Sequence, residues 1–226
     1  MKNVILIFFI LISCAISKQG FAQDKEYGIA IRLPKEYFTA AQKMNRAISA
    51  QEASPNSRNV FHITLFQGRF DQNKIDELQK TLRAQHFEKF RITFGLEIKT
   101  AQNRYINWIP KENNELKKMH HRVVEIANSY RLGILSRYID SYGDLTKEQR
   151  QQVVKYGMPG LFDDYEPHLT LFYFDKKNSE IEKIANKISV PENGHEINCC
   201  DATTLLIAEI GYRGNIEKVL YEIELQ

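Results

Sequence analysis

One pentapeptide occurs twice in the chain with a single conservative change, and this repeat constrains the fold more than any other feature. Residues 62–66 read HITLF, and residues 168–172 read HLTLF. Side chains two apart in a strand lie on the same face, so each copy predicts a strand with His and Thr on one face and apolar residues on the other. A helix and then two strands are predicted after each copy. We therefore expect an internal duplication that forms two similar lobes.

The hydrophobic pattern of the remaining chain predicts alternating short strands and helices. Strands are predicted over residues 26–33, 59–66, 90–99, 104–109, 166–174, 203–210 and 218–225, and helices over residues 36–51, 71–82, 112–130, 146–156 and 178–188. This mixture favours an α+β fold with two pseudo-symmetric lobes of mainly antiparallel sheet, outer helices and a central cleft that carries both motifs. Residues 132–164 are less regular and are interpreted as an insertion that forms a lid or one wall of the cleft.

Composition and charge exclude several classes of protein. The 226 residues are 43% hydrophobic and 26% charged, which is typical of a globular chain rather than a disordered or polytopic membrane chain. The formal net charge of +3 excludes a strongly basic protein that binds duplex DNA mainly by neutralising phosphates. It is compatible with a monomer that handles one or a few phosphates in a cleft.

Residues 1–22 are interpreted as a targeting segment rather than part of the fold. Lys2 precedes an apolar run over residues 4–12, which is too short for a membrane-spanning helix but typical of a signal peptide. Cleavage after Ala22 is expected, which leaves a single bilobal domain over residues 23–226 with a net charge of +1, since Lys2 and Lys18 are lost with no acid. Lipidation at Cys14 is the alternative. Both predict export to the bacterial periplasm or beyond the cell, without a stable membrane span.

The residue types that commonly bind metals do not form a predicted metal site. Cys199 and Cys200 are adjacent and cannot easily bridge to each other, so they are interpreted as small residues at the start of a strand or as partners in an intermolecular disulfide. His120 and His121 lie in the middle of a predicted helix, where neighbouring residues point to different faces, and are interpreted as surface residues. No metal and no cofactor are expected.

The four polar residues of the repeat suit phosphoryl chemistry. Near neutral pH, one imidazole of the pair His62 and His168 can accept a proton while the other donates one. The hydroxyl groups of Thr64 and Thr170 can hold phosphoryl oxygens. Serine-type catalysis fits less well because no serine lies in a G-x-S-x-G motif. Zinc also fits less well because neither copy adds a cysteine or carboxylate at ligand spacing.

These paired H-x-T motifs, about a hundred residues apart in a duplicated α+β chain, resemble the 2H phosphoesterase superfamily. That group includes LigT-like 2'-5' RNA ligases and 2',3'-cyclic phosphodiesterases, and the resemblance covers residues 26–226. It implies that His62 and His168 are the catalytic acid and base, in that order of preference, and that Thr64 and Thr170 bind phosphate. The implied substrate is a nucleotide or a short RNA, opened at a 2',3'-cyclic phosphate or a 2'-5' bond. A ligase and a non-catalytic nucleotide-binding module are the alternatives.

Four further residues are weaker candidates for contact with a substrate. Tyr105 and Trp108 lie on a predicted strand and are candidate platforms for base stacking, with core packing as the alternative role. Arg69 and Arg213 are candidate phosphate ligands, with a solvated surface role as the alternative.

Overall fold

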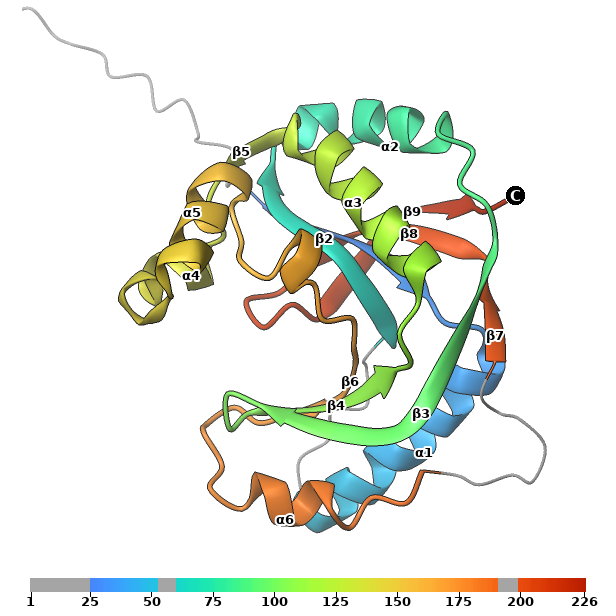
Figure 1. The fold of residues 1–226 in the computed structure, drawn as a ribbon, viewed down its shortest axis with the longest axis vertical. Coiled ribbons are helices and arrows are strands. Elements are labelled where there is room, and N and C mark those ends of the chain that lie inside the picture. The colour runs from blue at the N-terminus through green and yellow to red at the C-terminus, as the bar shows by residue number, and fades with distance from the viewer. Residues whose placement is uncertain (1–24, 53–59, 191–198) are drawn as a thin grey trace, which may run out of the picture.

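A computed structural model describes residues 25–52, 60–190 and 199–226 (Figure 1). The predicted signal peptide and Cys14 lie outside these residues, and so do the side chains of Cys199 and Cys200. Among the described residues, the structure contains no helix with both the length and the apolar character to cross a membrane.

The described strands form one open sheet in which every pair is antiparallel. The strands are β1 (Glu26–Arg32), β2 (His62–Phe70), β3 (Phe90–Ala101), β4 (Tyr105–Pro110), β5 (Arg131–Gly133), β6 (Leu169–Tyr173), β7 (Cys199–Ala202), β8 (Thr204–Ile210) and β9 (Ile216–Glu224). Their order is β7-β3-β4-β6-β2-β1-β8-β9, and β5 pairs with β2 outside this path. The predicted α+β fold with mainly antiparallel sheet is confirmed.

Helices cover the outside of this curved sheet. They are α1 (Lys35–Glu52), α2 (Ile75–Arg83), α3 (Asn114–Asn128), α4 (Ser136–Asp140), α5 (Lys147–Tyr156) and α6 (Ile181–Ala185), with short 3-10 turns η1 (Gln72–Lys74), η2 (Tyr142–Asp144) and η3 (Phe162–Asp164). Figure 1 shows α2 and α3 at the top of the molecule and α1 and α6 at the bottom. The helix α3 contacts β2, whereas α1 contacts β6, so each central strand carries one long helix.

The sequence duplication and the two groups of strands do not coincide. The first group of strands is β2-β1-β8-β9 and the second is β6-β4-β3-β7. The two groups meet where β2 pairs with β6. The hairpin β3-β4, which follows the first motif, pairs with the strand of the second motif. The strands β8 and β9, which follow the second motif, extend the sheet from β1 beside the first. The structural repeat also begins earlier than the motifs, because β1-α1-β2 has its counterpart in β4-α3-β6.

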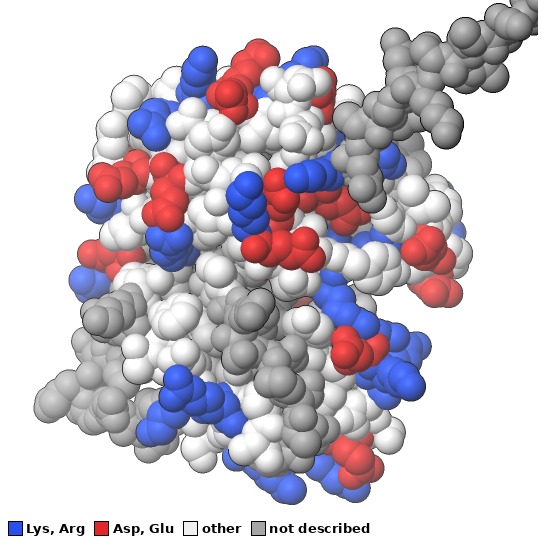
Figure 2. Space-filling view, turned by 180° about the vertical axis from the view of Figure 1, so that it is seen from behind, with Lys and Arg blue, Asp and Glu red and all other residues white. Residues whose placement is uncertain are grey.

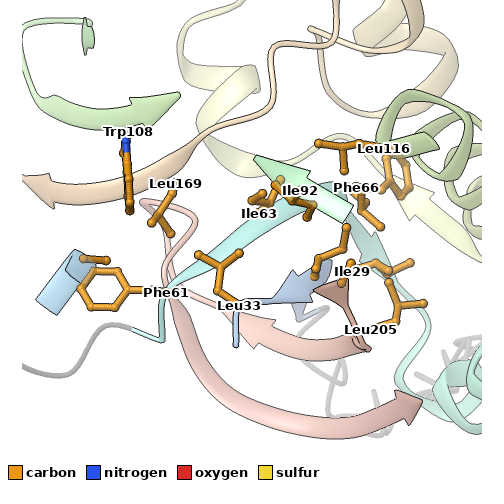
Figure 3. Packing of buried hydrophobic residues seen from close by; sticks show 14 of the residues in the cluster. Ile29, Leu33, Phe61, Ile63, Phe66, Ile92, Trp108, Leu116, Leu169 and Leu205 are labelled. Carbon is orange, nitrogen blue, oxygen red and sulfur yellow. The ribbon is translucent and has the colours of Figure 1, made fainter. Parts of the chain in front are cut away.

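The hydrophobic core lies between the sheet and these helices and is continuous through the junction. Ile63 of β2 and Leu169 of β6 are completely buried, and Figure 3 shows Ile29 and Leu205 packed in the same cluster. Burial of each such side chain contributes roughly 1.5–3 kcal/mol. The core therefore joins both groups of strands into one unit.

Residues 132–164 pack against the sheet rather than standing apart from it. The strand β5 pairs with β2, with Gly133 opposite Arg69. The Sδ atom of Met158 accepts a hydrogen bond from the backbone N–H of Gln67 at 3.3 Å. These contacts place part of this segment beside β2.

Candidate active site

The two motif strands meet at a single residue pair, Ile63 opposite Leu169, in antiparallel register. This register brings each motif histidine beside the motif threonine of the other strand. Burial alternates from the histidine to the threonine of each motif, since the intervening apolar residue is buried while the motif histidine and threonine are half-buried. The four polar residues that meet at the junction are His62, Thr64, His168 and Thr170.

Both histidines are held in the same tautomer. His62 donates from Nδ1 to the carbonyl oxygen of Val60 at 2.6 Å, and His168 donates from Nδ1 to the carbonyl oxygen of Glu166 at 2.9 Å. A carbonyl oxygen can only accept, so in each neutral imidazole the proton lies on Nδ1. Each ring therefore presents Nε2 with a free lone pair, and each uses a carbonyl two residues earlier in the chain to do so.

Burial keeps both imidazoles neutral near pH 7. It lowers the pKa of His62, against the opposing effect of the Val60 carbonyl, and a positive charge on His168, when that ring is protonated, lowers this pKa further. Burial also lowers the pKa of His168, but the Glu166 carbonyl and then the Glu166 carboxylate both act to raise it. The Glu166 carboxylate thus favours the protonated form of His168, and a charged His168 disfavours a proton on His62.

The hydroxyl of Thr170 has a partner that the sequence did not identify. It donates to Oδ1 of Asn107 at 3.1 Å, and Asn107 lies directly opposite it on β4. Asn107 is buried between Ile106 and Trp108, which are also buried. An amide inside an apolar strand needs a hydrogen-bonding partner. The position of Asn107 between two apolar residues was therefore the sequence signal that could have indicated this contact.

A β-bulge occurs at the same position in both motif strands, three residues after the histidine. The register skips Leu65 between β1 and β2, and it skips Leu171 between β4 and β6. A helix side chain binds each bulged carbonyl: Nδ1 of His120 in α3 donates to Leu65 at 2.7 Å, and Nδ2 of Asn45 in α1 donates to Leu171 at 2.6 Å. These buried bonds satisfy carbonyl groups at the point where the strands diverge.

The prediction that His120 is a surface residue is wrong. Its exposed fraction is 0%, and its ring stacks on Tyr165 with centroids 3.7 Å apart. Its Nε2 atom accepts a hydrogen bond from the backbone N–H of Phe162 at 2.9 Å. Burial lowers the pKa of His120 to about 4, so the ring is neutral. The prediction failed because residues 161–165 cover a helix face that sequence periodicity alone leaves open. The neighbouring His121 is half-buried.

The four weaker candidates for contact with a substrate lie in different surroundings in the structure. Trp108 is only 1% exposed and its Nε1 atom donates to the carbonyl of Gly95 at 2.8 Å, so it belongs to the core and offers no face to a base. Tyr105 is half-buried at the start of β4, and Arg213 lies in the turn between β8 and β9. Arg69 lies near the far end of β2, opposite Gly133 of β5.

Comparison with solved structures identifies the fold. The chain superposes on Escherichia coli LigT, solved with NADP+, with a TM-score of 0.53 over 90% of this chain and 98% of that chain at 15% identity. The chain has the LigT fold.

Two further structures share the LigT fold at similar distance. TT0787 of Thermus thermophilus matches with a TM-score of 0.53 at 14% identity, over 88% of this chain and 97% of that chain. A structure described as a phosphoesterase matches with a TM-score of 0.50 at 13% identity, over 90% and 99%. No family model matches the chain, and no curated protein matches its sequence. The fold that these structures share with the chain agrees with the predicted resemblance to 2H phosphoesterases.

Proposed function

We propose that this protein is a metal-independent phosphodiesterase that opens a 2',3'-cyclic phosphate or a 2'-5' phosphodiester of a nucleotide or short RNA. One observation carries the proposal: two half-buried histidines at the strand junction are held in the same tautomer, each beside the threonine of the other motif. The likeness to LigT, which was solved with a nucleotide, supports the substrate class.

The electrostatics of the pair favour one assignment of roles. The Glu166 carboxylate favours the proton on His168, and a charged His168 disfavours a proton on His62. We therefore assign His62 as the base and His168 as the acid in hydrolysis, the reverse of the order preferred from the sequence. His62 takes a proton from water through Nε2 as the new O–P bond forms, and His168 gives its proton to the departing ribose oxygen as the old P–O bond breaks.

The threonines hold the non-bridging oxygens while charge shifts on the phosphoryl group. Thr170 now donates to Oδ1 of Asn107. A half-turn of the Asn107 amide lets its Nδ2 donate instead, which frees the Thr170 hydroxyl proton for the phosphate. Asn107 is thus a positioning residue for one of the two phosphate ligands.

Hydrolysis of nucleoside 2',3'-cyclic phosphates by the purified protein in EDTA tests this function. We expect His62→Ala and His168→Ala each to lower kcat/KM by about 100- to 10,000-fold, the usual contribution of general acid–base catalysis. His86→Ala is the matched control, because the His86 side chain is exposed and bonds to the side chain of the C-terminal Gln226. Full activity in both site variants would refute the mechanism, and loss of wild-type activity in EDTA would indicate a metal.

We also propose that the protein is exported, on the basis of residues 1–22 alone. The N-terminal residue of protein recovered from an expressing bacterium distinguishes cleavage after Ala22 from lipidation at Cys14. An N-terminus at Met1 in a cytoplasmic fraction would contradict export.

A further inference from the structure

Two tyrosines extend the polar face of the site away from the histidines. Tyr105 of β4 lies opposite Tyr173 of β6. Tyr105 and Asn107 are two apart on one strand, so they share a face and lie about 7 Å apart along it. The bulge at Leu171 shifts the alternation of β6, which places Tyr173 on the same face as Thr170. Both tyrosines are half-buried, so this face continues beyond the phosphate ligands.

Three arginines from separate elements lie close enough to Tyr105 for their charges to act on its phenol. Burial raises the pKa of Tyr105, while the positive charges of Arg137, Arg213 and Arg104 act in the opposite direction. Arg137 lies in α4, Arg213 in the turn between β8 and β9, and Arg104 immediately before β4. At neutral pH the raised pKa keeps the phenol protonated, so Tyr105 is a neutral donor in a positively charged environment.

The guanidinium groups of Arg213 and Arg137 are each held in place by contacts with other groups of the protein. Arg213 donates to the carbonyl oxygens of Phe174 at 3.1 Å and Asp175 at 2.8 Å, and its guanidinium lies 5.6 Å from the centre of the Tyr173 ring. Its side chain is 22% exposed, and its Nη2 atom is 3.5 Å from the exposed carboxylate of Asp175. Backbone bonds of this kind fix the direction of the guanidinium before any ligand binds.

Arg137 is fixed in a similar way on the β2 side. It donates to the side-chain oxygen of Gln67 and lies 3.6 Å from the carboxylate of Glu26, and its side chain is 15% exposed. Gln67 and Arg213 are themselves linked through the turn, since the Gln67 amide donates to the carbonyl of Gly214 at 3.5 Å. The two arginines therefore belong to one connected structure that spans both groups of strands.

Positive charge exceeds negative charge around these residues. The positive charges of three arginines act on Tyr105, whereas Glu26 and Asp175 are the carboxylates paired with Arg137 and Arg213. The adjoining loop adds Lys176 and Lys177 and lines a cavity of about 380 Å³ bounded by residues 172–179. Figure 2 shows Lys and Arg side chains gathered at the right-hand edge of the rear face, on the side where Figure 1 places the turn after β6.

We propose that Tyr105, Arg137 and Arg213 form a second phosphate subsite, occupied by the phosphate next to the reactive one. This inference rests on the proposed function and narrows its substrate class to nucleotides or oligonucleotides that carry a further phosphate. The phenol and guanidinium donors bind the phosphate oxygens, and the cavity beside Tyr173 accommodates the next nucleotide of a longer substrate. A nucleoside cyclic phosphate with a free 5'-hydroxyl leaves the subsite empty.

The test compares adenosine 2',3'-cyclic phosphate with and without a 5'-phosphate. We expect wild-type kcat/KM to be about ten- to a hundredfold higher for the 5'-phosphorylated substrate, the gain typical of charge-assisted hydrogen bonds. Arg213→Met and Arg137→Met bring this ratio close to one, whereas Arg213→Lys retains part of it. Arg91→Met is the control and keeps the wild-type ratio, because Arg91 is paired with Asp201 in an exposed ion pair. A wild-type ratio of one would overturn the proposal.

A binding measurement separates failure of the subsite from failure of the proposed function. Affinities for adenosine 3',5'-bisphosphate and adenosine 3'-monophosphate are compared by calorimetry, which requires no turnover. We expect a preference for the bisphosphate that Arg213→Lys weakens and Arg213→Met removes. This result in a protein without hydrolytic activity would support the subsite and refute the phosphodiesterase. Equal affinities in the wild type would overturn the subsite whatever the activity.

Discussion

At the scale of single residues, the motif histidines can exchange protons with a substrate only through Nε2. Each Nδ1 is bonded to a carbonyl two residues earlier in the chain, which fixes both the tautomer and the ring direction. This arrangement needs no third side chain to orient either imidazole. The chemistry of the site is therefore governed by how strongly each Nε2 binds a proton.

The pH dependence of kcat/KM should reflect the lowered pKa values of the pair. A bell-shaped profile requires one histidine to be neutral and the other protonated. Because burial lowers the pKa of both His62 and His168, both limbs of the profile move to lower pH. We expect a maximum below about pH 6.5, the ordinary histidine value. A maximum above about pH 7.5 in initial-rate measurements would contradict these lowered values.

Replacement of Asn107 tests the support of Thr170. Asn107→Leu leaves the Thr170 hydroxyl without its buried partner, and we expect kcat/KM to fall by about tenfold, as for the loss of one hydrogen bond in the site. Asn114→Leu is the control, since Asn114 is exposed on α3. Circular dichroism verifies that both variants are folded. Equal activity in the two variants would show that Thr170 needs no support from Asn107.

The two H-x-T pairs could be predicted because strand periodicity puts His and Thr on the same face regardless of the rest of the fold. The roles of Asn107 and His120 could not be predicted from the sequence. Each depends on a partner distant in sequence, Thr170 in one case and Leu65 and Phe162 in the other. A local pattern reports that a residue is polar or apolar, but it does not report which segment covers it.

At the scale of elements, each central strand is tied to a long helix by one buried side chain at its bulge. His120 connects α3 to β2, and Asn45 connects α1 to β6. Both bonds end three residues after a motif histidine, so they hold the strands where they begin to diverge. The helices thereby help to set the angle at which the two motifs meet.

Protonation of His120 should destabilise the fold at acid pH. Its pKa is about 4 in the folded protein, below the value of about 6.5 expected when unfolded, so the unfolded state binds more protons between these values. The free energy of unfolding therefore falls as pH decreases from about 6.5 to about 4, by on the order of 3 kcal/mol from this group.

Denaturant unfolding at about pH 7 and about pH 4.5 measures this effect. His120→Gln cannot titrate, and we expect it to lose less stability than the wild type between the two pH values. His86→Gln is the control for the loss of a histidine, because His86 is exposed. Equal losses in all three proteins would show that His120 is not the group responsible.

The regular elements were predicted where local signals were complete. The helix predicted over residues 112–130 is observed as α3, and the Asn113 side chain caps it by accepting from the backbone of Leu116 at 3.0 Å. The helix predicted over residues 178–188 is reduced to α6, five residues long. The strand β5 and the helix α4 were missed because they are only three and five residues long, too short to show a period.

At the scale of the whole molecule, the exchange of strands between the two groups joins them into one folding unit. The hairpin after the first motif completes the group of the second, and the strands after the second motif complete the group of the first. Neither group can therefore form from one half of the chain. Pairing partners such as β1 and β8 lie more than 170 residues apart in sequence, which is why local patterns could not predict this arrangement.

Equilibrium unfolding followed by two probes tests whether the two groups of strands unfold together. Trp108 is the single tryptophan of the chain and lies in the group that contains β4, whereas far-ultraviolet circular dichroism reports the entire molecule. We expect coincident transitions in both signals, as in a two-state process. Two separate transitions, with fluorescence changing independently, would show that the groups unfold as distinct domains.

The most direct test of catalysis by the two histidines measures how much ¹⁸O from labelled water enters the product. Adenosine 2',3'-cyclic phosphate is hydrolysed in ¹⁸O-labelled water that contains EDTA. Attack by water activated at His62 and His168 predicts that wild-type protein forms adenosine monophosphate with one ¹⁸O atom in the phosphate, and that His62→Ala and His168→Ala form almost none. Absence of any labelled product with the wild type, or equal yields from all three proteins, would contradict this mechanism.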